Sequence, residues 1–261
     1  MELRSAALKA LQLADPVAKA AAARALHPTP QGTLDTTAHL VADGPLPGRT
    51  ERPPLVAPAD VPRRSPFTPE GRAALLHAVA HIELNAINLA LDAVWRFADM
   101  PADYYRDWLR VAAEEALHFT LLSEHLATLG CSYGDLAAHD GLWTMTERTA
   151  GDLTARMALV PRTLEARGLD ATPPMQDKLK RAGDHRAVAI LDVILHDEIG
   201  HVAVGNRWYR WLCERDGLDP LAHYAVLAER HGAPRLRGPF NLAARSAAGF
   251  TEAEIAALGE A

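Results

Sequence analysis

The longest run of helical periodicity lies between Thr68 and Met100. Apolar residues and one glutamate recur there at intervals of three and four, and they form one stripe made of Leu76, Val79, Ala80, Glu83, Ile87, Ala90 and Val94. Thr68 is a typical N-cap, Pro69 suits the first helical turn, and Pro101 closes the pattern. The spacing therefore predicts a helix over 68–100.

Three further stretches show the same periodicity. It predicts helices over about 103–129, 144–166 and 184–215, the middle one ending where "RGLDATPP" disturbs the pattern. Asp184 is a typical N-cap for the last of them. No stretch alternates convincingly at period two, so we predict an all-α fold with little or no sheet.

The beginning of the chain differs from this pattern. Residues 1–26 are alanine-rich and amphipathic, which predicts a helix or a helix pair, whereas residues 27–69 hold ten of the 18 prolines and cannot be regular helix. We expect the proline-rich part to wrap along the main body, which would shelter Leu55, Val56 and Val61. A disordered linker is the alternative interpretation.

These changes of pattern divide the chain into three parts. We predict an N-terminal helical segment with a proline-rich wrapping arm over 1–67 and a four-helix bundle over 68–216. The remaining residues, 217–261, are expected to form a tail that packs on the bundle.

Composition narrows the class of protein without naming a function. The formal net charge of −6 gives no general electrostatic reason to bind nucleic acid or an anionic membrane, although a local basic patch stays open. Two cysteines, Cys131 and Cys213, lie far apart, as is typical of a reducing compartment. The N-terminal stretch lacks an unbroken apolar run, and no later segment approaches a membrane-spanning one, so we expect a cytoplasmic protein.

Two of the predicted helices carry the pattern Glu-x-x-His, as Glu115 with His118 and as Glu198 with His201. Residues three apart lie on one helical face, so the carboxylate and the imidazole can point toward a common ion. With 15 glutamates and 12 histidines in 261 positions, chance alone supplies roughly 0.7 such pairs. The pattern by itself is therefore a weak signal.

A preceding glutamate strengthens the signal. Glu83 lies 32 residues before Glu115, and Glu165 lies 33 residues before Glu198, so two helical hairpins repeat one arrangement. Glu147 competes with Glu165, because it lies about five helical turns earlier on the same stripe and only one of the two can reach the site. The symmetry of the hairpins favours Glu165.

Four carboxylates and two imidazoles inside an apolar bundle would be strongly destabilising as bare charges. Two divalent cations would balance the four negative charges and leave the imidazoles neutral. Oxygen and nitrogen ligands without thiolate favour iron or manganese over structural zinc. The alternative is an ordinary helical bundle whose glutamates and histidines lie on solvated faces or pair with arginines.

At these residues the sequence resembles the ferritin-like di-iron carboxylate superfamily, whose four-helix bundle supplies Glu, Glu-x-x-His, Glu and Glu-x-x-His. It is also similar over nearly its whole length to an uncharacterised bacterial family of ferritin-like proteins, domain-of-unknown-function family 455. That likeness is carried by "HAVAHIELNAINLALDAVWRF", "YGDLAAHDGLW", "ARMALVPRTLEARGLD" and "DEIGHVAVGNRW". It implies a ferritin-like bundle built from two hairpins, and it brings no established reaction.

The resemblance also implies a set of metal ligands. They are Glu83, Glu115, His118, Glu165, Glu198 and His201. The superfamily pattern makes Glu115 and Glu198 the bridging carboxylates, with Glu83 and Glu165 terminal. The implied cofactor is a pair of iron ions, with manganese as the alternative.

We therefore expect an oxygen-dependent oxidoreductase or hydroxylase with a dinuclear iron or manganese centre. Its reaction partners would be dioxygen and a small organic substrate, and the sequence identifies neither the substrate nor the electron donor. A metal-handling ferroxidase or metal-binding protein without turnover is one alternative. A tRNA-modifying hydroxylase is another, since "LEARG" at 164–168 is similar to tRNA-hydroxylating di-iron monooxygenases. A homodimer is compatible with the sequence, which leaves the oligomeric state open.

Other polar residues have two interpretations each. His77 and His81 lie on a different face from Glu83, where they form either a substrate-facing strip or a polar helix edge beneath the proline-rich arm. His139 and Asp140 lie in a nonhelical connection, where they either serve function or form a turn.

Overall fold

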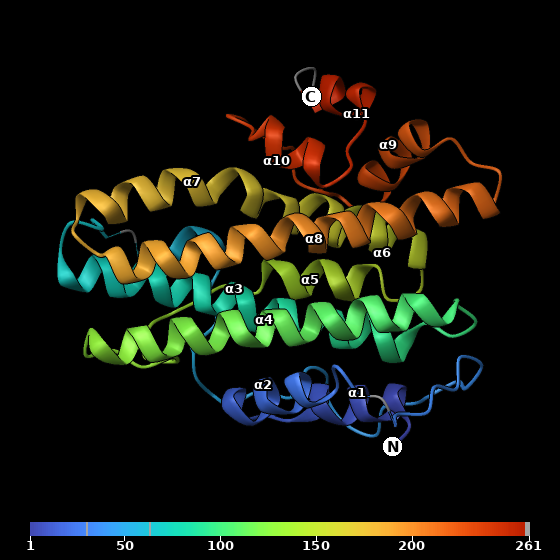
Figure 1. Ribbon diagram of the computed structural model, residues 1–261, viewed down its shortest axis with the longest axis horizontal. Helices are drawn as coiled ribbons and strands as arrows, with labels where there is room; N and C mark the ends of the chain where they lie inside the picture. Colours follow the sequence, from blue (N-terminus) through green and yellow to red (C-terminus); the bar gives the residue numbers. More distant parts are fainter. Residues whose placement is uncertain (30, 63, 259–261) are drawn as a thin grey trace. The chain divides into compact units, whose positions relative to one another are not determined.

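The computed structural model describes residues 1–29, 31–62 and 64–258. Within them the fold is all-helical, with two isolated β-bridges and no strand, which confirms the all-α prediction. The chain forms two compact units (Figure 1). The first unit comprises Met1–Trp143 and Lys178–Ile190, and the second comprises Thr144–Asp177 and Leu191–Ala261.

Four helices make up most of the first unit. They are α1 (Leu3–Gln12), α2 (Pro16–Ala25), α3 (Pro69–Arg96) and α4 (Ala102–Thr128). The predicted N-cap of α3 is confirmed, because Thr68 Oγ1 accepts a hydrogen bond of 3.1 Å from the backbone N–H of Gly71. A short connection joins α3 to α4, which lie side by side as a helical hairpin (Figure 1).

Helix α3 is buried on more than one face, because α4 packs on one side of it and α1 and α2 pack elsewhere. Polar residues outside its apolar stripe are consequently buried as well. Asp92, for example, is fully buried, accepts a hydrogen bond from Trp95 Nε1 at 3.1 Å and forms an ion pair with Arg96 at 2.7 Å. The helix is thus a core element whose buried polar groups have partners.

Helix α3 is also long and apolar enough to cross a membrane, contrary to our expectation from the sequence. Its apolar window is, however, 72% buried within the protein, as in the core helix of a globular domain. The burial is compatible with a cytoplasmic location, which stays a prediction.

A buried arginine from α1 satisfies the C-terminal end of α3. Arg4 is fully buried and donates to the carbonyl oxygen of Val94 at 3.1 Å and to that of Trp95 at 2.9 Å. The last carbonyls of a helix have no partner inside the helix, and a cation interacts favourably with them. The N-terminal segment therefore stabilises the helix that carries Glu83.

Polar contacts hold part of the proline-rich arm against the connection that follows α4. The N–H of Val56 donates to the carbonyl of Ala138 at 2.9 Å, and Arg49 forms an ion pair with Asp140 at 2.7 Å. The expectation that Leu55 would be sheltered is wrong, since this side chain is 43% exposed. Backbone pairing holds the arm without requiring apolar burial.

The second unit is less regular. It contains α6 (Leu153–Leu159) and the π-helix η2 (Val160–Glu165), and shares with the first unit the helices α5 (Gly141–Arg148), α7 (Ala166–Arg181) and α8 (His185–Arg215). The predicted helix over 144–166 is wrong. A turn at 149–152 interrupts it, and α7 continues through the "RGLDATPP" stretch that we expected to break it.

A contact from the C-terminal tail compensates for one of the two prolines in α7. Pro173 has no N–H to donate to the carbonyl of Leu169, four residues earlier. That carbonyl instead accepts a hydrogen bond of 3.2 Å from Asn241 Nδ2. A distant segment therefore replaces the bond that proline removes.

The tail forms α9 (Pro220–Arg230), α10 (Leu242–Ala247) and α11 (Glu252–Leu258). It packs on α7 and α8 within the second unit, through a cluster made of Ala166, Leu169, Val202, Ala244, Ala248 and Phe250. Glu254 adds ion pairs with the buried Arg162 at 2.8 Å and with the partly exposed Arg210 at 2.7 Å. The division into arm, four-helix bundle and tail, and the ferritin-like form of the bundle, stay predictions.

Candidate metal centre

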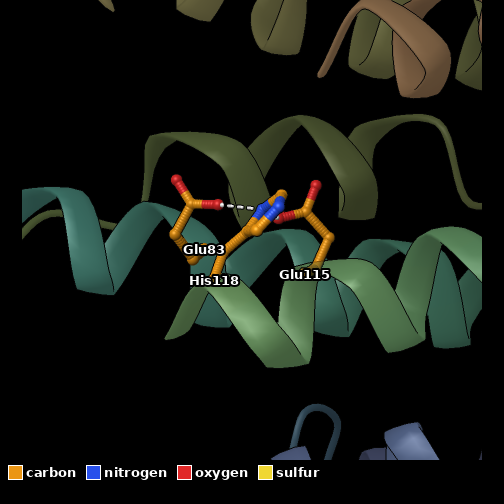
Figure 2. A group of neighbouring side chains, drawn as sticks. All are labelled: Glu83, Glu115 and His118. Atoms are coloured by element: carbon orange, nitrogen blue, oxygen red, sulfur yellow. Dashed lines mark hydrogen bonds and ion pairs between the residues drawn. The ribbon is translucent and has the colours of Figure 1, made fainter. Parts of the chain in front are cut away.

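Three of the predicted ligands meet in the first unit. Glu83 comes from α3, while Glu115 and His118 come from α4, and we call these residues the first set. His118 Nδ1 lies 3.1 Å from Glu83 Oε2 and 3.2 Å from Glu115 Oε2. Figure 2 shows the imidazole between the two carboxylates. One candidate ligand atom from each residue lies within 4.8 Å of the others, so the group could hold a metal ion.

Local structure explains this arrangement. Glu115 and His118 are three residues apart on α4 and therefore share a face. Pro101 follows Glu83 by 18 residues and precedes Glu115 by 14, so the hairpin brings the two glutamates to the same level. The predicted spacing thus produces the predicted convergence within this hairpin.

Burial makes negative charge on the two carboxylates of the first set unfavourable. Glu83 is 2% exposed, and Glu115 and His118 are fully buried. Burial and the neighbouring carboxylate of Glu115 together raise the pKa of Glu83 to about 8, against the opposing hydrogen bond from His118. A bound divalent cation would favour both carboxylates in their charged form. Two carboxylates and one imidazole, without thiolate, suit iron or manganese.

The other three predicted ligands lie in the second unit. We call Glu165, at the end of η2, together with Glu198 and His201 of α8, the second set. All three side chains are buried. Glu198 Oε2 lies 3.9 Å from His201 Nδ1, which is longer than a hydrogen bond. The second set therefore has a looser carboxylate–imidazole pair than the first.

Two glycines lie near the second set, and one of them permits a close approach of two segments. A Cβ atom on Gly168 would lie 4.0 Å from the carboxylate carbon of Glu198, so this turn of α7 faces that side chain. A Cβ atom on Gly205 would lie 2.6 Å from Cβ of Pro161, a separation that real side chains do not adopt. Glycine at 205 thus permits η2 and α8 to pack closely.

The π-helix changes the local register just before Glu165. Thr163 Oγ1 donates to the carbonyl of Ala158, five residues earlier, at 2.8 Å. Short π-helical segments occur frequently at functional sites. The sequence analysis missed this feature, although Pro161 inside a helical pattern is a visible sign of irregular hydrogen bonding.

Burial favours Glu165 over Glu147 as the fourth carboxylate. Glu147 lies on α5 and is exposed, whereas Glu165 is 6% exposed. The premise that both lie on one continuous helix is wrong, because the turn at 149–152 separates them. The "LEARG" stretch supplies Glu165 and Gly168.

His77 and His81 hold the connection between α4 and α5 against α3. The N–H of Gly134 donates to His77 Nε2 at 2.9 Å, and Tyr133 stacks on the His77 ring with centroids 5.3 Å apart. His81 Nδ1 and the Tyr133 hydroxyl lie 2.8 Å apart. Both histidines therefore have a structural role in holding Tyr133 and Gly134 against α3.

His139 and Asp140 are explained by local structure. His139 is exposed, and its Nδ1 accepts a hydrogen bond of 3.3 Å from the N–H of Gly141, where α5 begins. Asp140 holds the arm through Arg49. Turn formation and arm docking account for these two residues.

Comparison with known proteins agrees with the resemblance seen in the sequence. A family model described as protein of unknown function (DUF455) matches residues 12–256. A Haemophilus influenzae protein described as an uncharacterized protein is 54% identical over 212 residues, which cover 78% of this chain and 74% of that protein. No solved structure matches the chain. Any activity must therefore be argued from the side chains.

Proposed function

Because the chain belongs to the DUF455 family, whose description assigns no activity, we propose a function from its side chains. In this proposal the protein is an iron-dependent oxidoreductase that binds two divalent ions per chain and oxidises a small organic substrate with dioxygen. Manganese is the alternative metal. The ferritin-like, dinuclear form of the centre is part of the proposal.

The observation that carries the proposal is the buried first set. Two carboxylates and an imidazole face one another at 3.1 and 3.2 Å, and all three side chains are buried. Clustering of like charges at such depth is unfavourable unless a proton or a cation compensates it. A divalent cation compensates both carboxylates at once, which supports a metal site over a purely structural cluster.

The repeated sequence pattern supports a second ion. The second set has the same residue types at nearly the same spacing, and its three side chains are buried. We therefore assign one ion to each set. Whether the two ions are magnetically coupled tests the dinuclear form directly.

The residues of the first set would hold the metal and would release protons when it binds. The ring nitrogen that faces both carboxylates is His118 Nδ1, so metal binding must displace the proton at this atom and the proton that Glu83 retains near neutral pH. Val79 and Ile87, one turn before and after Glu83, are buried and exclude water. Reduced iron, when bound, would supply the electrons for the reduction of dioxygen.

The test is anaerobic preparation of the metal-free protein, followed by loading with Fe(II), elemental analysis and Mössbauer spectroscopy. We expect two ions per chain, spectra that change on exposure to oxygen, and oxygen uptake in the presence of a reductant. Uptake that ends when the added Fe(II) is oxidised would instead indicate metal handling by ferroxidation. Failure to bind iron or manganese above the background of a variant lacking the ligands would refute the proposal.

A further inference from the structure

The first unit contains a cavity of about 170 Å³ on another side of α3. The beginning of α2, arm residues 48–53 and Leu55 enclose it together with α3 and Tyr133. His81 and Asn85 line it, and each is two residues from Glu83, hence about 200° away around the helix. The cavity is therefore separate from the first set, and what it binds does not depend on the proposed function.

Lys19 brings a buried amino group to this cavity, and the group is positively charged below about pH 7. Its side chain is 1% exposed, and Nζ donates to the carbonyl of Gly48 at 2.8 Å and to Asn88 Oδ1 at 2.7 Å. Both acceptors are neutral. An ammonium group has three N–H donors, so one donor is left for a further partner. Burial, with the nearby charge of Arg49, lowers the pKa of Lys19 to about 7.

Hydrogen bonds among Asn85, His81 and Tyr133 leave the hydroxyl group of Tyr133 as a second donor for the cavity. Asn85 Nδ2 lies 3.2 Å from the carbonyl oxygen of His81, which only accepts, so this atom is the amino group. The same nitrogen lies 3.0 Å from His81 Nε2, which must therefore accept. His81 then carries its proton on Nδ1 and donates it to the Tyr133 oxygen at 2.8 Å. The hydroxyl proton of Tyr133 is left to donate to a ligand.

Asn88 provides a third donor by the same reasoning. Its Oδ1 accepts from the Lys19 ammonium, so the other end of the amide is the donating amino group. Leu84 and Leu55 add apolar surface to the lining. The lining also holds the carboxylate of Glu51, which the guanidinium groups of Arg49 and Arg52 outnumber. A cavity with several donors, an excess of cationic groups and apolar walls matches a ligand that has an anionic head and a hydrocarbon body.

We propose that this cavity binds a small organic carboxylate whose head pairs with Lys19 and accepts hydrogen bonds from Tyr133 and Asn88. A cavity of about 150 Å³ holds benzene, so the volume here suits a monocarboxylate up to roughly the size of benzoate. The carboxylate supplies the negative charge that Lys19 lacks among its present partners.

The experiment is calorimetric titration of the full chain with benzoate and with benzamide, its neutral isostere, at constant chloride concentration. We expect benzoate to bind at one site per chain and benzamide to bind roughly tenfold more weakly or worse, since it lacks the charge that pairs with Lys19. Equal affinity for the two probes, or no binding of benzoate at millimolar concentration, overturns the proposal.

Two substitutions locate the site. Lys19→Met removes the charge with little change of volume and should weaken benzoate binding roughly tenfold or more, whereas Lys9→Met, at an exposed position of α1, should leave it unchanged. Asn88→Asp places a carboxylate beside Lys19 without a change of shape, so it should compensate the charge internally, exclude benzoate and raise the melting temperature. Unchanged benzoate affinity in folded Asn88→Asp protein contradicts the assignment, even if Lys19→Met does not fold.

Discussion

The first and second sets share one sequence pattern but rest on different backbones. In the first unit the carboxylates and the imidazole lie on two regular helices, and the ring nitrogen of His118 lies within 3.2 Å of both carboxylates. In the second unit a π-helix precedes Glu165, and the corresponding carboxylate–imidazole separation on α8 is 3.9 Å. Equal spacing in sequence therefore does not produce equal geometry.

The difference shows what holds each set in place. The spacing of residues on α3 and α4 is enough to position the first set. The surroundings of the second set depend on distant residues, since Arg162 of η2 pairs with Glu254 of α11 and Gly205 admits Pro161. Because the first set is already assembled, we expect it to bind its ion more tightly than the second set.

The largest expected effect comes from removing a ligand of the first set. Glu115→Gln removes one of the two carboxylate charges, and we expect the affinity for the tighter ion to fall by at least about a hundredfold. Titration of the metal-free protein with Mn(II), followed by electron paramagnetic resonance, measures the loss. Glu198→Gln should weaken the other ion and leave the tighter one bound.

Glu114→Gln is the matched control, since this half-buried glutamate is adjacent on α4 but points away from the set. If Glu114→Gln and Glu115→Gln weaken binding equally, the first set is not the metal site. If Glu198→Gln removes the tighter ion, the order of affinities is the reverse of the one expected.

The next effect concerns the ion pairs that hold η2. Glu254→Gln leaves the buried Arg162 without its charged partner and should destabilise the protein by about 3–5 kcal/mol. Urea denaturation followed by circular dichroism measures the change. Glu252→Gln, at an exposed position of the same helix, should change stability by less than about 0.5 kcal/mol. Similar losses in both variants would show that the pair does not stabilise the second unit.

A smaller effect should appear in the pH dependence of the metal-free protein. Glu83 retains its proton up to about pH 8 in the folded state, whereas an unfolded glutamate loses it near 4.5. The folded state therefore binds more protons between these values, and stability should fall by a few kcal/mol as pH rises from about 5 to 8. Glu83→Gln should flatten this slope in urea denaturation.

Metal should reverse the trend, because iron or manganese binds the deprotonated carboxylate and its affinity rises with pH. Stability of the loaded protein that falls with pH as steeply as that of the metal-free protein would show that the metal does not bind at Glu83.

The smallest expected effect is a difference in stability between alanine substitutions at two glycines of α8. Gly205→Ala places a Cβ atom 2.6 Å from Cβ of Pro161, so we expect a loss of about 1–3 kcal/mol from overpacking. Gly200→Ala meets nothing within 4 Å and should instead gain up to about 1 kcal/mol from helix propensity. Thermal unfolding of both variants compares them. Stabilisation by Gly205→Ala would show that η2 and α8 are not closely packed.

Sequence reasoning predicted the regular part of the molecule well. Thr68 caps α3 as expected, and helical spacing brought Glu83 level with Glu115. These features depend on interactions within three or four residues, which a local pattern records. The convergence of the first set followed from them, because a short connection leaves a hairpin few arrangements. The predicted end of α3 is wrong, because α3 stops at Arg96 and Pro101 instead caps α4.

The irregular part could not be predicted, because distant residues decide it. Pro173 and Pro174 indicate a break, and the carbonyl freed by Pro173 finds Asn241 about 70 residues further along the chain. Lys19 gives no sign of its burial either, since a lysine in an alanine-rich helix is typical of a solvated face. The hydrogen bond from Lys19 to Asn88 can be recognised only once α2 is known to pack on α3.

The buried position of Arg4 has a practical consequence for work with the purified protein. Its guanidinium group donates to the carbonyls of Val94 and Trp95 in the last turn of α3, so loss of the segment that carries Arg4 would disturb the helix that presents Glu83. Preparations trimmed by proteases before Ser5 should be checked for metal content before any lack of activity is interpreted.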